Sequence, residues 1–146
     1  MSSEGCFLGF DFGERKIGVA VGHALTSTAN PLVTLKAEHG QPDWGVVADL
    51  IQEWKPRALV VGLPLQMDGT RQEVTRLAQK FANRLRGRFG LPVHTMDERL
   101  SSAEAADFIK NEREKGNRGK TRRGDEDRIA AALILQHWLE TRNADG

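Results

Sequence analysis

Residues 6–21 read Cys6-Phe-Leu-Gly-Phe-Asp-Phe-Gly-Glu-Arg-Lys-Ile-Gly-Val-Ala-Val21, so two apolar runs flank a short polar turn. Both faces of the first run are apolar up to Asp11, which is typical of a central strand covered on both sides. The second run continues to Gly22 and keeps small residues on one of its faces. We expect these two strands to organise the fold, and we expect the small-residue face to let a helix approach closely.

Asp11 closes a strand that is predicted to be buried. Burying an unpaired carboxylate is costly, because the charge loses its hydration. Asp11 therefore needs a cation, a metal ion or an opening to solvent. Alternatively, Asp11 begins a hairpin turn and accepts a hydrogen bond from its own backbone. Taken alone, residues 6–21 leave both interpretations open.

The composition bounds the class of protein. The 146 residues predict one domain over 1–146, large enough to form a core without covalent crosslinks. The 21 Lys and Arg nearly balance the 20 Asp and Glu, so only the distribution of charge is informative. The single cysteine, Cys6, excludes an internal disulfide framework and a zinc-finger array. No signal-peptide pattern or membrane-length apolar run is present, so we expect a soluble cytoplasmic protein with no membrane partner.

The rest of the chain alternates between strand and helix patterns. In chain order we expect a strand at 31–35, a helix opening at 41–44 and stopped by Pro56, a strand at 58–62, a helix capped by Thr70 and Glu73, a strand at 91–97, a helix from Ser101 or Ser102 to Lys110, and a last helix from Asp125 or Asp127. This order predicts an α/β fold with a mixed five-stranded sheet and helices on both faces. Residues 111–124 are predicted to form a mobile basic loop, and 1–5 and 143–146 to be frayed tails.

Three carboxylates converge in this topology. Sites in α/β sheets lie beyond the carboxyl ends of parallel strands, where Asp11 and Glu98 are expected. Asp127 shares one helical face with Ala130, Ala131 and Ile134, so it is predicted to point inward. Taken as a single residue, Asp127 is better explained as complementing the helix dipole from the first turn, and Asp125 is expected to cap the helix.

A cluster of three acids has a specific chemistry. Close carboxylates repel one another unless a cation neutralises them, and an all-oxygen site favours Mg²⁺ or Mn²⁺. Two such ions can cleave a phosphodiester. The basic loop and the cationic surface of the helix over 71–89 would then hold a polyanionic backbone, although a charged helix face is often only solvated.

Four sequence blocks in order resemble the YqgF family: Asp11-Phe-Gly with Ile17-Gly-Val-Ala-Val21, Val61-Gly-Leu-Pro-Leu-Gln-Met-Asp-Gly-Thr70, Asp97-Glu-Arg-Leu-Ser101 and Asp127-Arg-Ile-Ala-Ala. These proteins are described as pre-16S ribosomal RNA nucleases and as Holliday-junction resolvase-like proteins, with a ribonuclease-H-like fold. The resemblance implies a metal-dependent nuclease that trims the 5′ end of precursor 16S rRNA during ribosome maturation.

The resemblance also implies residue roles. By position, the catalytic and metal-binding acids are Asp11, Glu98 and Asp127, and Asp125 is a possible additional ligand. Arg99 is placed either at the scissile phosphate or in a salt bridge to a neighbouring acid. Glu14 departs from the small or polar residue expected after Asp-Phe-Gly. The residues expected to bind nucleic acid are Arg99, Arg118, Lys120, Arg122 and Arg123.

Other functions fit parts of the same pattern. The same acids could resolve branched DNA, or the fold could serve a non-catalytic nucleic-acid-binding factor that acts in transcription. The Asp-x-Gly hairpin also resembles the phosphate loop of actin-like kinases, but those need two such domains and 146 residues are too few. The expected partners are precursor rRNA or structured DNA and the ribosome, and the sequence leaves the oligomeric state open.

Overall fold

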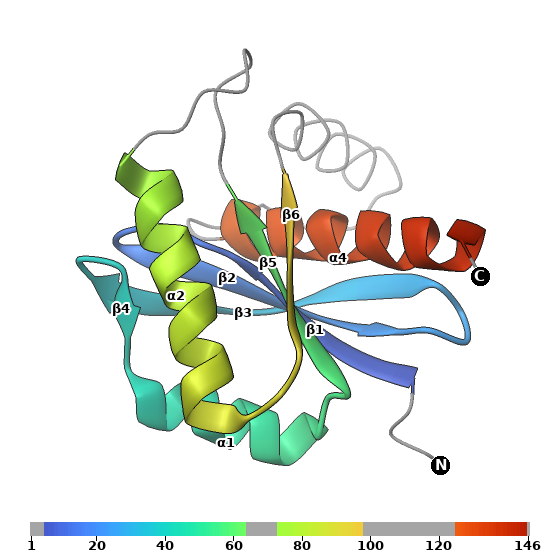
Figure 1. Cartoon of the computed structure of the whole chain (residues 1–146), viewed down its shortest axis with the longest axis horizontal. Helices are drawn as coiled ribbons and strands as arrows, with labels where there is room; N and C mark the ends of the chain where they lie inside the picture. Colours follow the sequence, from blue (N-terminus) through green and yellow to red (C-terminus); the bar gives the residue numbers. More distant parts are fainter. Residues whose placement is uncertain (1–4, 64–72, 98–124, 146) are drawn as a thin grey trace.

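The computed structural model describes residues 5–63, 73–97 and 125–145. Within these ranges the chain forms a sheet of six strands in the order β4-β3-β2-β1-β5-β6 (Figure 1). The strands are β1 (Cys6–Asp11), β2 (Lys16–His23), β3 (Thr28–Glu38), β4 (Gln41–Pro42), β5 (Ala58–Leu63) and β6 (Val93–Asp97), and the helices are α1 (Trp44–Trp54), α2 (Glu73–Phe89) and α4 (Asp125–Asp145).

The pairing of the strands confirms the predicted topology. β1 pairs antiparallel with β2, and β2 pairs antiparallel with β3, so the first three strands form a meander. β1 pairs parallel with β5, and β5 pairs parallel with β6. β1 is therefore central, and the carboxyl ends of β1, β5 and β6 lie at one edge of the sheet.

Of the helices that the structure describes, α1 and α2 cover one face of the sheet and α4 covers the other. Cys6, Leu8 and Phe10 of β1 belong to a core cluster that includes buried residues of α1 and α2. Phe7 belongs to a second cluster, formed with the buried residues of α4. The predicted α/β fold with helices on both faces is thus confirmed.

The region before α1 differs from the prediction. Gln41–Pro42 was expected to open the helix, but it forms β4 and pairs with β3, which makes the sheet six-stranded rather than five-stranded. The helix begins at Trp44, and Asp43 caps it by accepting a hydrogen bond from the backbone N–H of Gly45 at 2.9 Å. Two residues suffice for β4, because the turn that precedes it brings the chain straight back onto β3.

β3 and α4 are longer than predicted. β3 extends on both sides of the expected strand at 31–35, and its ladder with β2 shifts register between Val19 and Ala20. The shift lies opposite Pro31, which has no N–H to donate to a ladder. α4 continues through Asp145, past the tail that was expected from residue 143.

Several predicted features lie outside the described residues. These are Thr70 of the proposed capping pair, the helix from Ser101 or Ser102 to Lys110, and the basic loop at 111–124. In the part of the chain that is described, no helix is both long enough and apolar enough to cross a membrane.

Candidate active site

Asp11 lies at the carboxyl end of the central strand, between two glycines. In the sheet register, Asp11 is opposite Gly18 of β2 on one side and Gly62 of β5 on the other. Its side chain is half-buried, whereas the strand before it is fully buried. Neither of these two neighbours carries a side chain that could pack against the carboxylate.

The glycine on β2 is where the first turn of α4 rests on the sheet. A Cβ atom at Gly18 would collide with the backbone carbonyl of Asp127 and would come within 2.7 Å of the backbone nitrogen of Arg128. This contact is possible only because residue 18 has no side chain. The small-residue face of residues 18–22, predicted to admit a helix, therefore does so, and the helix brings Asp127 with it.

Asp11 and Asp127 lie on the same side of the sheet. Alternate residues of a strand share a face, and in β1 both Phe7 and Gly9 face α4. Asp11 is next in that series. The structure therefore brings together two of the three predicted acids, one from the end of β1 and one from the first turn of α4.

Glu98 lies outside the described residues. It directly follows Asp97, the last residue of β6, which pairs with Leu63 at the end of β5. Asp125 begins α4, and its side chain also lies outside the description. The described residues contain no group of three or more His, Cys, Asp or Glu side chains that could hold a metal ion. The predicted triad is thus represented by Asp11 and Asp127, and the roles of all three acids remain predictions.

The predicted nucleic-acid-binding residues Arg99, Arg118, Lys120, Arg122 and Arg123 also lie outside the described residues. What the structure does describe is the cationic surface of α2. Arg76, Lys80, Arg84 and Arg88 follow one another at intervals of four, and no acidic residue occurs between Val74 and Phe89. Residues at this spacing share one stripe of a helix.

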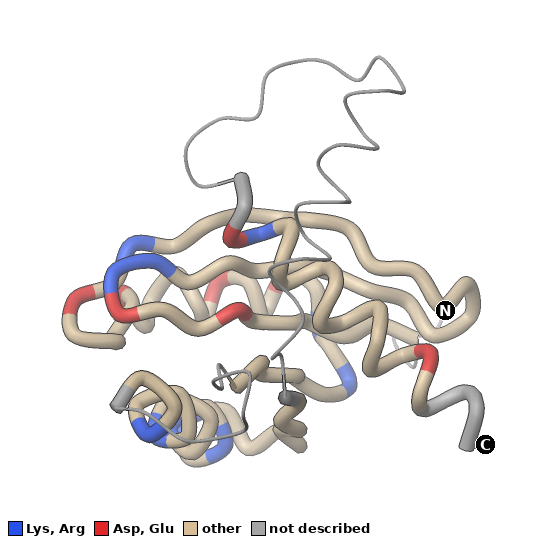
Figure 2. The backbone as a smooth tube through the Cα atoms, turned by 90° about the horizontal axis from the view of Figure 1, so that it is seen from above, with Lys and Arg blue, Asp and Glu red and all other residues tan. Residues whose placement is uncertain are grey.

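The cationic stripe of α2, Arg76-Lys80-Arg84-Arg88, faces away from the sheet. Figure 2 looks along α2 and shows Lys and Arg on its outer surface. Arg88 is also anchored, because its guanidinium lies 4.4 Å from the ring centroid of Trp44. The N-terminal end of α2 lies toward the same edge of the sheet as the tips of β5 and β6 (Figure 1). The stripe therefore begins near the edge of the sheet where β5 and β6 end, and it runs along the face opposite to α4.

The sequence nominates three acids, but it does not indicate how the surroundings of Asp11 are built. The glycines on either side of Asp11 were not recognised as a feature of the site. A signal was present, since Gly18 begins the small-residue face and Gly62 ends an otherwise continuous apolar strand. Placing Gly18 and Gly62 opposite Asp11 requires the register of the strands, which the sequence does not specify.

Comparison with known proteins gives the family. A family model described as "RuvX: Holliday junction resolvase" matches residues 5–141. The chain belongs to this family. A relative from Pseudomonas putida is 58% identical over 135 residues, covering 91% of this chain and 93% of its own length. A relative from Azotobacter vinelandii is 53% identical over 144 residues, covering 99% of both chains. Each is named "Putative pre-16S rRNA nuclease".

Solved structures confirm the RuvX-family chain's ribonuclease-H-like fold. RuvC of T. thermophilus in complex with a Holliday junction substrate superimposes with a TM-score of 0.60 at 17% identity, covering 96% of each chain. The Fowlpox virus resolvase, in complex with Holliday junction DNA, gives a TM-score of 0.62 at 14% identity, covering 94% of this chain and 98% of the resolvase. Membership of the RuvX family places the chain among the nucleases, which are phosphodiester hydrolases.

Proposed function

We propose that this protein is a divalent-metal-dependent nuclease that processes the 5′ end of precursor 16S rRNA in the cytoplasm, acting on ribosomal precursors. The observation that carries the proposal is the meeting of Asp11 and Asp127 at one end of one face of the sheet. The relatives named as pre-16S rRNA nucleases support the choice of substrate.

Asp11, Glu98 and Asp127 would hold Mg²⁺ or Mn²⁺. Carboxylates are the ligands that these ions prefer. Asp11 suits such a role because its half-buried side chain lies on the same face of the sheet as the first turn of α4, which carries Asp127. When bound, the ions supply an activated water and stabilise the leaving oxygen of the phosphodiester. Asp11 would orient this assembly from the rigid central strand, and Asp127 from the helix that is fixed on Gly18.

The cationic stripe of α2 would position the substrate backbone. Successive members of the stripe lie about 6 Å apart along the helix axis, so they can follow consecutive phosphates of one strand. The basic loop residues and Arg99 would extend the same phosphate-binding surface beyond the described part of the chain. Such contacts release counterions, so binding should weaken steeply with salt.

The decisive experiment is cleavage of precursor 16S rRNA by the purified protein, with the new 5′ end mapped by primer extension. We expect cleavage with Mn²⁺ or Mg²⁺ and none with chelator. Asp11→Asn should abolish cleavage and retain RNA binding, whereas the matched control Asp49→Asn, on the exposed side of α1, should cleave normally. Binding without cleavage in the unmodified protein would instead identify a non-catalytic nucleic-acid-binding factor.

Resolution of branched DNA is the second candidate, favoured by the family description and by the resolvase structures. The same acids would serve both reactions. Parallel cleavage of a four-way DNA junction and precursor rRNA separates the two candidates. Preferential cleavage of the junction would replace the rRNA proposal with the resolvase one.

A further inference from the structure

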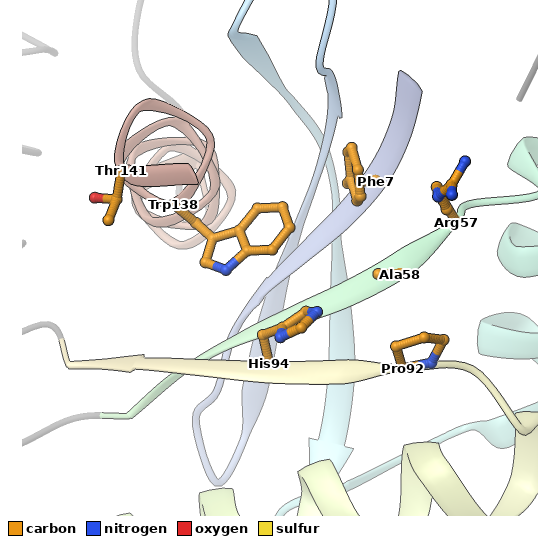
Figure 3. A pocket seen from close by; sticks show the side chains of 7 residues that line it. All are labelled: Phe7, Arg57, Ala58, Pro92, His94, Trp138 and Thr141. Carbon is orange, nitrogen blue, oxygen red and sulfur yellow. The ribbon is translucent and has the colours of Figure 1, made fainter. Parts of the chain in front are cut away.

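A pocket of about 430 Å³ lies on the α4 face at the end of the sheet remote from Asp11. The described residues that line it are Phe7, Arg57, Ala58, Pro92, His94, Trp138 and Thr141. Figure 3 shows Trp138 on α4 and Arg57 at opposite sides of the pocket, with Ala58 of β5 between them. Ala58 forms the floor of the pocket, and its short side chain leaves the space between Trp138 and Arg57 open.

The sheet register gives the separation of this pocket from the candidate active site. Phe7 is opposite Ala58 at the pocket, and Asp11 is opposite Gly62 at the site. The two levels are four residues apart on both strands, which corresponds to about 13 Å. Both lie on the α4 face, so a strand of nucleic acid engaged at Asp11 has a short path to the pocket.

The walls of the pocket are aromatic and partly open to solvent. The rings of His94 and Trp138 have centroids 5.0 Å apart and planes 33° apart, and Phe7 meets Trp138 edge-on at 5.1 Å. Phe7 is buried, whereas Trp138 is half-buried and His94 is exposed. The His94 and Trp138 rings are thus fixed by packing while part of their surface is available to a planar ligand.

The polar groups of the pocket select the kind of ligand. Arg57 is exposed and carries a planar fork of N–H donors, and Thr141 adds a hydroxyl. None of the described lining residues is a carboxylate. These described residues therefore offer a cationic ligand no counter-charge. A ring with carbonyl or ring-nitrogen acceptors, attached to a phosphate, matches both the aromatic surface and the guanidinium.

We propose that this pocket binds a nucleobase of a single-stranded segment of nucleic acid, with the base stacked against the His94–Trp138 pair and Arg57 on its acceptor edge or adjoining phosphate. The assignment of the base to a substrate strand rests on the proposed nuclease function. The pocket volume is sufficient for one nucleotide. Stacking of this kind tolerates any base, so the pocket would hold the strand and would not read its sequence.

The test is titration of the full-length ¹⁵N-labelled protein in the presence of chelator, which prevents metal-dependent cleavage. The probes are adenosine 5′-monophosphate and penta-adenylate RNA, and the reporters are the indole resonance of Trp138 and the backbone amides at 57, 58 and 94. We expect both probes to shift these resonances. Penta-adenylate binding at least about tenfold more tightly than the mononucleotide would identify a strand as the source of the base.

Two variants and a control make the test specific. His94→Ala and Arg57→Ala should each weaken penta-adenylate binding by about tenfold, because one removes a stacking surface and the other removes the donors. His23→Ala is the matched control: His23 is also exposed, and it lies near the same end of the sheet, pairing with Cys6 on the opposite face. It should leave the affinity unchanged. Equal losses in His94→Ala and His23→Ala would overturn the assignment.

The remaining outcomes separate this proposal from the proposed function. If adenosine 5′-monophosphate bound as tightly as penta-adenylate or more tightly, the pocket would be a site for free nucleotides. That result would overturn the strand-binding role. No shift by either probe would overturn the pocket outright, even if the protein cleaves precursor rRNA. Conversely, the protein could cleave no nucleic acid with Mn²⁺ and still show the expected shifts. That result would refute the nuclease proposal but support the nucleobase pocket.

Discussion

The two faces of the sheet are built from residues of opposite size. The face under α1 and α2 is filled with rings, in which Phe81 contacts Phe10 at 5.6 Å, Phe12 at 5.4 Å and Trp44 at 5.7 Å between centroids. The face under α4 carries small residues where the helix crosses β1 and β2, namely Gly9, Gly18, Ala20 and Gly22, and a Cβ at Gly9 would lie 2.8 Å from the Cβ of Leu135. The layer of side chains under α1 and α2 is therefore thick, whereas α4 lies close to the backbone of the sheet.

This difference indicates that the two faces have different roles, one in stability and the other in the placement of α4. Rings bury large apolar areas and stabilise the fold, but they keep a helix at the full distance of their side chains. Glycine and alanine contribute little burial, and they let the backbone of α4 touch β2 beside Asp11. We infer that the ring face mainly maintains stability, and that the glycine face mainly fixes the geometry of the acids.

The largest expected effect comes from neutralising the acids on the glycine face. Asp11→Asn, Glu98→Gln and Asp127→Asn should each lower the rate of Mn²⁺-dependent cleavage by on the order of 10³-fold or more, because each would remove a metal ligand. Thermal unfolding should be nearly unchanged in all three. Asp125→Asn should be milder, and an essential Asp125 beside a dispensable Asp127 would refute the helix-face argument.

On the ring face, the expected effect is on stability. Phe81→Ala should lower the free energy of unfolding by about 3–5 kcal/mol, since Phe81 is fully buried and its removal leaves a cavity among three other rings. Urea unfolding measures the loss. At a temperature where this variant remains folded, its cleavage rate should stay within a few-fold of the unmodified protein, and a folded but inactive Phe81→Ala would contradict these roles of the two faces.

Glycine substitutions sharpen the comparison. Gly18→Ala should cost about 1–3 kcal/mol and also abolish cleavage, because the added methyl group forces the first turn of α4 off the strand. At Gly22 the added Cβ would meet only the side-chain ends of Leu135 and Leu139, so Gly22→Ala should be milder and retain cleavage. Unfolding curves and cleavage rates distinguish the two positions.

Gly87→Ala should change the free energy of unfolding in the opposite direction to Gly18→Ala. Gly87 lies in α2, and nothing lies within 4 Å of a Cβ added there. Alanine should therefore stabilise the protein by about 0.5–1 kcal/mol. A destabilised Gly87→Ala would show that the cost at Gly18 reflects the loss of glycine in general and not the contact with Asp127.

The smallest expected effect concerns Cys6, on the ring face. Burial raises the pKa of the Cys6 thiol above its ordinary value. The stability contributed by the neutral thiol is complete below the pKa of the unfolded chain and is lost as pH rises through the higher pKa of the folded state. Stability should therefore decline more in the unmodified protein than in Cys6→Ala between pH 8 and pH 10, as urea midpoints would show.

Local patterns were enough to predict most of the fold. The apolar run at 6–10 was correctly predicted to be a central strand covered on both faces, and the run at 58–62 to be a buried strand, since the two pair with each other in the sheet. The helix predicted over 71–89 is confirmed as α2, and its apolar side chains lie in the core. These segments succeed because their burial follows from periodicity within one element.

Features that depend on pairing were not predictable in the same way. Pro42 at a helix start is a common pattern, and only the turn that returns the chain to β3 converts it into a strand residue. The placement of Gly62 beside Asp11, and the pocket between Ala58 and Trp138, likewise follow from register between distant segments. The sequence could nominate Asp127, but its position near Asp11 depends on how α4 docks across β1 and β2, with its first turn against Gly18.

The order of the elements along the chain has a consequence for synthesis. Every described strand precedes α4, so a growing polypeptide can pair its strands while Phe7, Ala20 and Val60 still lack their cover. The same helix that closes this apolar surface brings Asp127. Covering this apolar surface and placing Asp127, the last of the proposed acids, therefore occur in one docking event. A product that stops short of residue 125 would expose the surface to aggregation and lack this proposed ligand.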